Sequence, residues 1–217
     1  MKMPPSNPYS PTSPEQLETV FIDADIVVAN KPSGLLSVPG LGLEKTVCAN
    51  SQLSARHGDV LTVHRLDMDT SGLIIFARNK DTQRALSRQF ELRRVEKSYE
   101  ALVEGRIDAD TGTIDKAIAR HSRNRPLRHL DPDGQNAITH WTALQTELNV
   151  TRVQLRPETG RSHQLRLHMA SHGHPILGDV FYGNPDSHPR LCLHAKELAF
   201  THPVSGQRLA FATTTPF

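Results

Sequence analysis

The stretch TVHRLDMDTSGLIIFAR, residues 62–78, crowds charged side chains against the start of an apolar run. The run GLIIFAR, residues 72–78, has the compact apolar composition of a buried strand, and the T-S-G before it predicts a tight turn. Asp67 then lies at the edge of the core, where partial desolvation raises a carboxylate pKa unless a cation compensates. An arginine partner would make Asp67 a positioned, ionised nucleophile, whereas the alternative is an aspartate that only caps the turn.

Outward from this stretch, the N-terminal half alternates strands and helices. VFIDADIVVANKP, residues 20–32, predicts a hairpin ending at Lys31-Pro32, and the Pro- and Gly-rich residues 32–42 predict a loop. Residues 44–57 predict a short helix. Asn79 predicts the N-cap of a second helix that runs to about Arg93.

The C-terminal half is dominated by strands. Alternating or apolar patterns predict strands over residues 96–105, 112–118, 138–147 and 150–157, and two more around the turn at 203–206. GRSHQLRLHMASHG, residues 160–173, predicts a helix that Gly173 ends, and residues 119–136 predict a long exposed connection that could order on a partner. Neighbouring strand pairs indicate an α+β fold with a mixed, largely antiparallel central sheet and flanking helices and loops.

Length and composition indicate one soluble domain. The 217 residues suffice for a substantial core, and we expect a flexible Pro- and Ser-rich tail at 1–17 followed by a single domain at 18–217. No window is long and apolar enough for a membrane span, so we expect no membrane partner. Cys48 and Cys192 have no C-x-x-C partner and fit free thiols in the reducing cytoplasm.

Basic residues are concentrated in two places although the net charge is only +2. RHSRNRPLRH, residues 120–129, holds four Arg and two His without an acid, and residues 151–168 hold four Arg and two His against one Glu. Acid-poor segments of this kind suit contacts with phosphate groups. The alternative is an ordinary solvated cationic surface.

Several other enzyme classes fit the motifs poorly. The order H-R-L-D differs from the kinase order, and no Gly-rich phosphate loop is present. Asp67 and Asp69 occupy alternate positions and are badly placed as a glycosidase pair. His168 and His172 have the spacing of two metal ligands on a helix but no H-E-x-x-H around them, so we expect no metal. No G-x-S-x-G accompanies Ser71.

HRLDMDTSGL, residues 64–73, resembles the signature H-R-L-D-x-x-T-S-G-L of the RluA-type pseudouridine synthases. Further segments resemble the same family in the family's order, among them VVANKPSGLLSVPG, RQFELRRVEKSYEALVEG, RPETGRSHQLRLHMASHGHPILGDVFYG and LCLHAKELAFTHPVSG. The resemblance covers roughly residues 18–214. It implies the catalytic fold of these enzymes, a mixed sheet with an active-site cleft. These enzymes isomerise uridine in RNA without a cofactor or a metal.

The resemblance also implies roles for individual residues. Asp67 matches the catalytic aspartate, and Arg166 matches the arginine that pairs with it. Tyr99 matches the tyrosine expected to stack on the flipped uracil and to help take its C5 proton. Leu167 matches a position that packs against the target base.

Other residues are expected to bind the RNA. Arg65 matches the arginine expected to fill the space that the flipped base leaves, and His64 is expected to position the aspartate loop. The remaining candidates are expected to contact phosphates along the stem, and they are Arg120, Arg123, Arg125 and Arg161.

The substrate expectation follows from a subgroup of the family. The chain resembles the small members that lack an S4-like domain and act on a stem-loop of 23S rRNA and on the anticodon stem-loop of tRNA. We expect a cytoplasmic monomer with that dual specificity. A synthase for only one of the two RNAs, and an RNA-binding factor without catalysis, remain as alternatives.

Overall fold

The computed structural model describes residues 9–11, 16–42, 45–121 and 126–217. The chain forms two compact units. We call the first the terminal unit, which comprises the described part of Asn7–Lys97 together with His194–Pro216. The second is the central unit, Ser98–Leu193 with Phe217.

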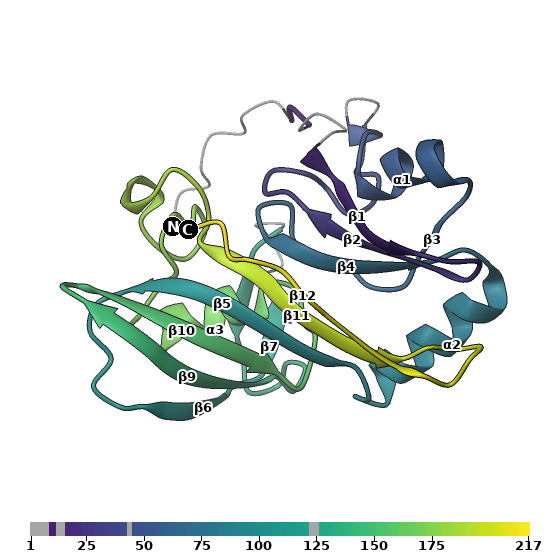
Figure 1. The fold of residues 1–217 in the computed structure, drawn as a ribbon. Coiled ribbons are helices and arrows are strands. Elements are labelled where there is room, and N and C mark those ends of the chain that lie inside the picture. The colour runs from purple at the N-terminus through teal and green to yellow at the C-terminus, as the bar shows by residue number, and fades with distance from the viewer. Residues whose placement is uncertain (1–8, 12–15, 43–44, 122–125) are drawn as a thin grey trace. The chain divides into compact units, whose positions relative to one another are not determined.

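The terminal unit is built on a mixed sheet (Figure 1). Its strands are β1 (Glu18–Ile22), β2 (Ile26–Lys31), β3 (Leu61–Thr62), β4 (Ser71–Ala77), β11 (Leu193–Thr201) and β12 (Arg208–Ala212). The hairpins β1–β2 and β11–β12 are antiparallel and confirm the strand pairs that the sequence predicts. The pairs β2–β4 and β3–β4 are also antiparallel. The pair β4–β11 is parallel and makes the sheet mixed.

Strand β4 is the buried centre of the terminal unit, because all seven of its residues are buried. Gly72 allows β11 to pair with it. A Cβ at this position would lie 2.3 Å from the carbonyl oxygen of Ala195, and the backbone φ of +111° also favours glycine. The glycine of the sequence signature is therefore required by strand packing.

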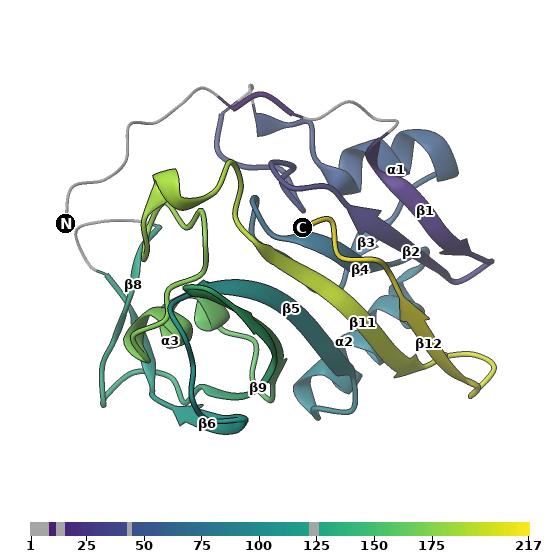
Figure 2. The same ribbon diagram turned by 60° about the vertical axis from the view of Figure 1, so that its left-hand side comes forward.

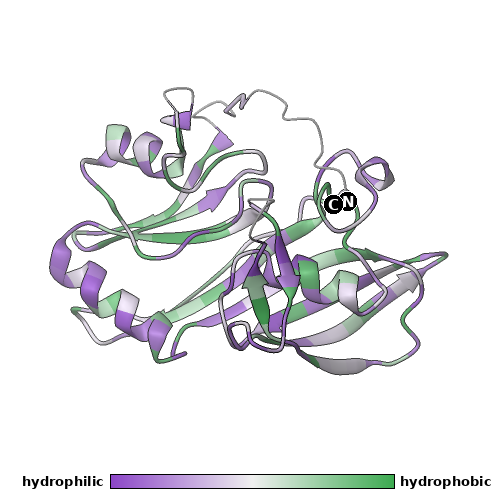
Figure 3. Cartoon of the chain, turned by 180° about the vertical axis from the view of Figure 1, so that it is seen from behind, coloured by the Kyte–Doolittle hydropathy of each residue, from purple (hydrophilic) through white to green (hydrophobic). Residues whose placement is uncertain are grey.

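The α-helices in the described part of the terminal unit are α1 (Ala49–His57) and α2 (Lys80–Glu91). Helix α1 begins later than predicted because the Cys48 thiol accepts a hydrogen bond from the amide of Ser51 and caps it. Asn79 caps α2 as predicted, accepting from the amide of Thr82. Figure 3 shows hydrophilic residues along much of α2, in accord with only Thr82 and Leu86 being buried.

The central unit is an antiparallel sheet in the order β5–β10–β9–β6 with one α-helix, α3 (Gln164–Ser171), and a short 3₁₀ helix, η3 (Pro185–Ser187). The four strands are β5 (Glu96–Glu104, which starts in the terminal unit), β6 (Thr111–Asp115), β9 (Ile138–Glu147) and β10 (Val150–Pro157). Figure 2 shows β5, β9 and β6 curving around α3. This α+β architecture with largely antiparallel strands confirms the predicted fold class.

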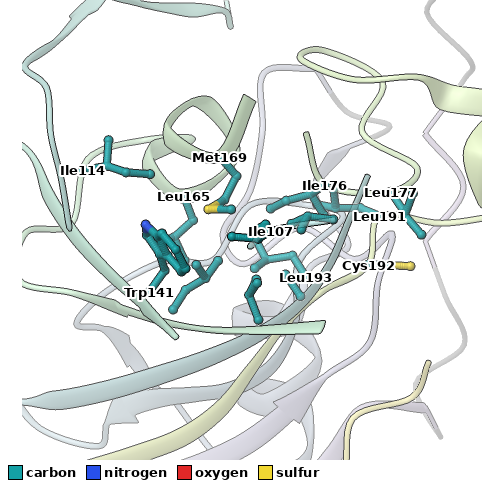
Figure 4. Packing of buried hydrophobic residues seen from close by; sticks show 14 residues of the cluster. Ile107, Ile114, Trp141, Leu165, Met169, Ile176, Leu177, Leu191, Cys192 and Leu193 are labelled. Carbon is teal, nitrogen blue, oxygen red and sulfur yellow. The ribbon is translucent and has the colours of Figure 1, made fainter. Parts of the chain in front are cut away.

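The apolar core of the central unit lies between this sheet and α3. Leu165 and Met169, one helical turn apart as the sequence predicts, lie beside Trp141 of β9 (Figure 4). Cys192 belongs to the same core, and its burial raises the pKa of the thiol to about 11. Both cysteines are free thiols, as expected, and both are buried.

One sequence expectation is corrected. Part of the predicted connection forms a two-stranded ribbon of β7 (Ile118–Arg120) and β8 (Arg128–Leu130). The two strands of the ribbon are held together by backbone hydrogen bonds, which do not require alternating apolar side chains. The polar sequence of the ribbon therefore gave no strand pattern. The ribbon is anchored by Leu127, which is 5% exposed.

Part of the segment predicted as a tail is packed where it is described. The Tyr9 hydroxyl donates to the carbonyl of Val47 at 2.8 Å, and Leu17 is completely buried. The expectation of one domain after a flexible tail otherwise stays a prediction. None of the helices in the described ranges has the length and apolar composition needed to cross a membrane.

Candidate active site and the residues that hold it

Asp67 lies in the loop between β3 and β4 of the terminal unit, with a half-buried side chain. Its carbonyl accepts a hydrogen bond from the amide of Thr70 at 3.2 Å, which closes a turn over Asp67–Thr70. The predicted turn at Thr70–Gly72 is wrong in place, because Ser71 and Gly72 already pair as the first residues of β4. Thr70 and Ser71 behind it are buried. The loop that carries Asp67 therefore ends on buried residues at the start of β4.

A buried lysine fixes this loop. The Lys31 ammonium is completely buried and donates to the carbonyl oxygens of Pro32, Leu35 and Met68 at 2.9, 2.7 and 2.9 Å. Three acceptors match the three donors of an ammonium group. Because Met68 follows Asp67 directly, the lysine ties the aspartate loop to the end of β2.

Two serines of the neighbouring loop add to this attachment. The Ser33 hydroxyl donates to the carbonyl of Asp69 at 2.7 Å. The Ser37 hydroxyl donates to the carbonyl of Leu66 at 2.7 Å and accepts from its amide at 3.1 Å. The backbone on both sides of Asp67 is thus held by side chains from residues 31–37, a preorganised arrangement suited to a catalytic group.

His64 is held as a neutral ring. Its Nε2 accepts a hydrogen bond from the amide of Ile75 in β4 at 3.1 Å, and the ring stacks on Phe90 with centroids 4.6 Å apart. Burial, with a smaller contribution from the charge of Lys97, lowers the pKa of His64 to about 3. Its neighbour Arg65 is exposed and hydrogen-bonds to no residue in the described ranges.

Arg166 is almost completely buried in the central unit, where Asp179 binds it in a bidentate ion pair. The Nε–Oδ2 and Nη2–Oδ1 distances are 2.8 and 2.6 Å, and the two side chains are 2% and 0% exposed. The guanidinium carbon lies 5.0 Å from the ring centroid of Phe181 and 5.6 Å from that of Tyr182. Both orientation and charge of Arg166 are therefore fixed within its own unit.

Asp179 is ionised by these contacts. Burial raises the pKa of the carboxyl group, but the Arg166 hydrogen bonds and charge, and the amides of Phe181 and Tyr182, outweigh burial and lower it. The two amides donate to Oδ1 at 2.8 and 3.1 Å. Removal of Asp179 would leave a cation in the core without its partner.

The Tyr182 hydroxyl connects α3 to the ribbon. It lies 2.8 Å from Nδ1 of His163, the residue before α3, and accepts a hydrogen bond from the amide of Arg128 at 2.9 Å. His163 has a left-handed backbone with φ of 58°. Tyr182 therefore contacts both the ribbon and the residue before α3, and its ring also packs on the Arg166 guanidinium.

Tyr99 and Leu167 also belong to the central unit. Tyr99 is half-buried on β5, where it packs against the main core cluster, and its backbone pairs with Leu155. Leu167 is 9% exposed and packs with Ile118 and Ala137 in a small cluster under the ribbon. Of the predicted phosphate contacts, Arg120 is exposed on β7 and Arg161 is half-buried before α3, whereas Arg123 and Arg125 lie outside the described residues.

The described residues offer one cluster with metal-ligand chemistry, formed by Asp23, Asp25 and His202. Nδ1 of His202 accepts from two backbone amides of the following turn, so the ring proton lies on Nε2, which is 3.1 Å from an Asp23 oxygen. Both ring nitrogens of His168 also have hydrogen-bond partners. Nδ1 contacts the Thr139 hydroxyl and Nε2 contacts the carbonyl of Lys116.

The predicted site residues divide between the units. Asp67, His64 and Arg65 lie in the terminal unit, and Tyr99, Arg166 and Leu167 lie in the central unit; the pairing of Arg166 with Asp67 stays a prediction. Sequence reasoning missed Asp179, the partner of Arg166 within its own unit, and Lys31. The signals available were charged residues within otherwise apolar or Gly-rich segments, ANKPSG and LGDVFYG.

Comparisons with known proteins agree with one another. Residues 25–171 match a family described as RNA pseudouridylate synthase. The dual-specificity RNA pseudouridine synthase RluA of Haemophilus influenzae is 44% identical over 96% of this chain and 98% of its own length. Its namesake in Escherichia coli K12 is 41% identical with the same coverage. The solved structure of human RNA Pseudouridylate Synthase Domain Containing 1 matches 96% of this chain and 87% of its own, with a TM-score of 0.81 and 32% identity.

Proposed function

Because this chain belongs to the RNA pseudouridylate synthase family and is an isomerase of uridine in RNA, we propose that it has two substrates. These are a stem-loop of 23S rRNA and the anticodon stem-loop of tRNA. Support comes from relatives named as dual-specificity enzymes that match almost the full chain. We also propose that it works as a monomer in the cytoplasm, with residues 18–217 acting as a single catalytic domain.

The proposed reaction centres on Asp67. The bond between N1 of uracil and C1′ of ribose breaks, and a bond between C5 and C1′ forms. C5 loses a proton and N1 gains one, so the product is an isomer. An ionised Asp67 carboxylate close to the sugar serves each route by which the base could be detached.

Tyr99 and Arg166 complete the proposed catalytic set. Tyr99 stacks on the flipped uracil and helps to remove the C5 proton. Arg166 keeps Asp67 ionised and oriented, and Asp179 acts as a positioning residue that holds the guanidinium in place. Leu167 packs against the base.

The remaining residues bind the flanking RNA in this proposal. Arg65 enters the space that the flipped uridine vacates, which suits its exposure and its lack of partners among the described residues. His64 positions the aspartate loop through Ile75 and Phe90. The arginines at 120, 123, 125 and 161 contact phosphates and set the affinity for RNA.

The observation that carries the assignment of Asp67 is its attachment to the fold. Lys31, Ser33 and Ser37 hold the backbone on both sides of this residue, although its own side chain is only half-buried. A merely solvated turn needs no such support. Rigid backbone with an accessible carboxylate is what a positioned catalytic group requires.

Tritium release from RNA that carries 5-tritiated uridine tests the proposal. The purified chain should release tritium from both stem-loops, since the C5 hydrogen leaves in the reaction, and Asp67→Asn should release none while it still binds RNA. Asp69→Asn, two residues away in the same loop, is the matched control and should stay active. Full activity of Asp67→Asn would exclude the mechanism.

The alternatives separate in the same assay. Turnover of the rRNA stem-loop alone, or of the tRNA stem-loop alone, would replace dual specificity by a single substrate. Tight binding of both RNAs without tritium release by the wild-type chain would indicate an RNA-binding factor. Mapping pseudouridine in both RNAs with and without the gene would decide the same question in the cell.

A further inference from the structure

A basic hollow of about 420 Å³ lies in the central unit, beside the ribbon and the start of α3. Three arginines and one acid are among its lining residues, which are Ile118, Ala119, Arg120, Arg128, Asp133, Gly134, Gln135, Arg161 and Ser162. Asp133 is the single carboxylate lining the hollow in the described part of the chain. The hollow is therefore a concave surface with net positive charge.

The placement of two of these arginines is unfavourable without an anion. Arg120 and Arg128 are direct cross-strand partners in the β7–β8 ladder. Like charges directly opposite one another destabilise a strand pair. Among the described residues, the Arg128 guanidinium donates only to the nearby carbonyls of Pro126 and Leu127, and the Arg120 side chain has no hydrogen-bond or ion-pair partner.

Arg161 is the third arginine that lines the hollow, and hydrogen bonds hold its backbone amide and its Nε atom. Its Nε donates to the carbonyl of Asn136 at 3.1 Å, and its amide donates to the side chain of Gln164 at 3.0 Å. The terminal nitrogens of its guanidinium have no partner among the described residues. Guanidinium groups that line one hollow, and whose donors are not used by carboxylates, are suited to a phosphate.

We propose that this hollow binds one backbone phosphate of the RNA substrate, with Arg120, Arg128 and Arg161 as its ligands. This inference rests on the proposed function and extends it by a defined phosphate site that includes Arg128. The amide of Arg128 is bound by the Tyr182 hydroxyl, and the Tyr182 ring covers Arg166. Tyr182 therefore connects the backbone of one phosphate ligand to the ring that packs on Arg166.

Binding of a synthetic RNA stem-loop at several salt concentrations tests this site. Arg120→Gln, Arg128→Gln and Arg161→Gln should each weaken binding about tenfold. Each should also reduce the slope of log affinity against log salt, by up to about 1. With tritiated RNA, KM should rise while kcat at saturating RNA stays unchanged. Arg106→Gln removes the same charge from an exposed position of the same unit that does not line the hollow, and should leave binding and slope nearly unchanged.

Stability separates a binding role from a structural role. Thermal unfolding of RNA-free Arg120→Gln should occur at the wild-type temperature or above it, because one of two opposed charges is gone. An unchanged slope in the three variants, or an equal loss in Arg106→Gln, would overturn the phosphate site. That failure differs from failure of the proposed function, in which the wild-type chain forms no pseudouridine at all.

Discussion

Asp67 and Asp179 are both aspartates in short turns, but their surroundings differ in nearly every respect. Asp179 is completely buried, and a bidentate arginine and two amides bind its carboxylate. Asp67 is half-buried, and its support acts on the backbone through Lys31 and the serines of the neighbouring loop.

The difference indicates two uses of one side chain. A carboxylate whose oxygens are all bound in the core stabilises structure, because it can no longer approach a substrate. A carboxylate on a rigid backbone, with the side chain reachable from solvent, can carry chemistry. The following substitutions test this distinction.

The largest effect is expected for Asp67→Asn on activity. Loss of the ionised group should lower the rate of tritium release by roughly 10⁴-fold or more. The free energy of unfolding should change by less than about 0.5 kcal/mol, because the fold is held by the backbone of the loop. A large loss of stability in urea denaturation would contradict the distinction.

Asp179→Asn should act first on stability, and activity should fall with it because Arg166 is no longer held in place. It leaves the buried Arg166 without its counter-charge, and we expect a loss of about 3–5 kcal/mol in the free energy of unfolding. Adding Arg166→Gln should restore part of that loss, since it removes the unpaired charge. Asp186→Asn, an exposed position in the same unit, is the control and should unfold like the wild type.

Lys31→Met tests the support of the Asp67 loop. Three carbonyl oxygens lose their donor, and we expect the free energy of unfolding to fall by about 2 kcal/mol. The rate of tritium release should fall as well, because the loop is no longer tied to β2. Lys80→Met on exposed α2 should change neither quantity, and equal behaviour of the two variants would refute the role of Lys31.

The smallest effect is expected from His64 and depends on pH. Its pKa is lowered from 6.5 to about 3 by folding, so the unfolded chain binds the proton first and stability falls as the pH drops from 6.5 toward 3. Because the ring is half-buried, we expect a loss of about 1 kcal/mol at pH 5 relative to pH 7, which His64→Gln should abolish. Parallel pH profiles of urea denaturation for both proteins would disprove this.

Local patterns in the sequence sufficed for most of the fold. The hairpin at β1–β2, the apolar run of β4 and the Asn79 cap each follow from neighbouring residues, and each is confirmed. The ribbon β7–β8 was missed, because its stability comes from backbone pairing and from a few anchors such as Leu127. Such contacts leave no periodic pattern.

The candidate site was predicted from the resemblance more than from local chemistry. The signature marked Asp67, but nothing in its spacing showed that Lys31 would lie under the loop or that Asp179 would bind Arg166. Both contacts join residues whose proximity is produced by the fold. A single sequence shows which residue is charged, but it does not show the distant partner whose hydrogen bonds offset the cost of burying that charge.

The ammonium group of Lys31, with its three carbonyl acceptors, has a further consequence for experiments. Such an amine is shielded from acylating reagents as long as the loop is closed, and each acylation at this position requires an opening event. The rate at which an amine-reactive label reaches Lys31, followed by peptide mass spectrometry, therefore measures how often the aspartate loop detaches from β2. Slower labelling in the presence of RNA would show that substrate holds the loop closed.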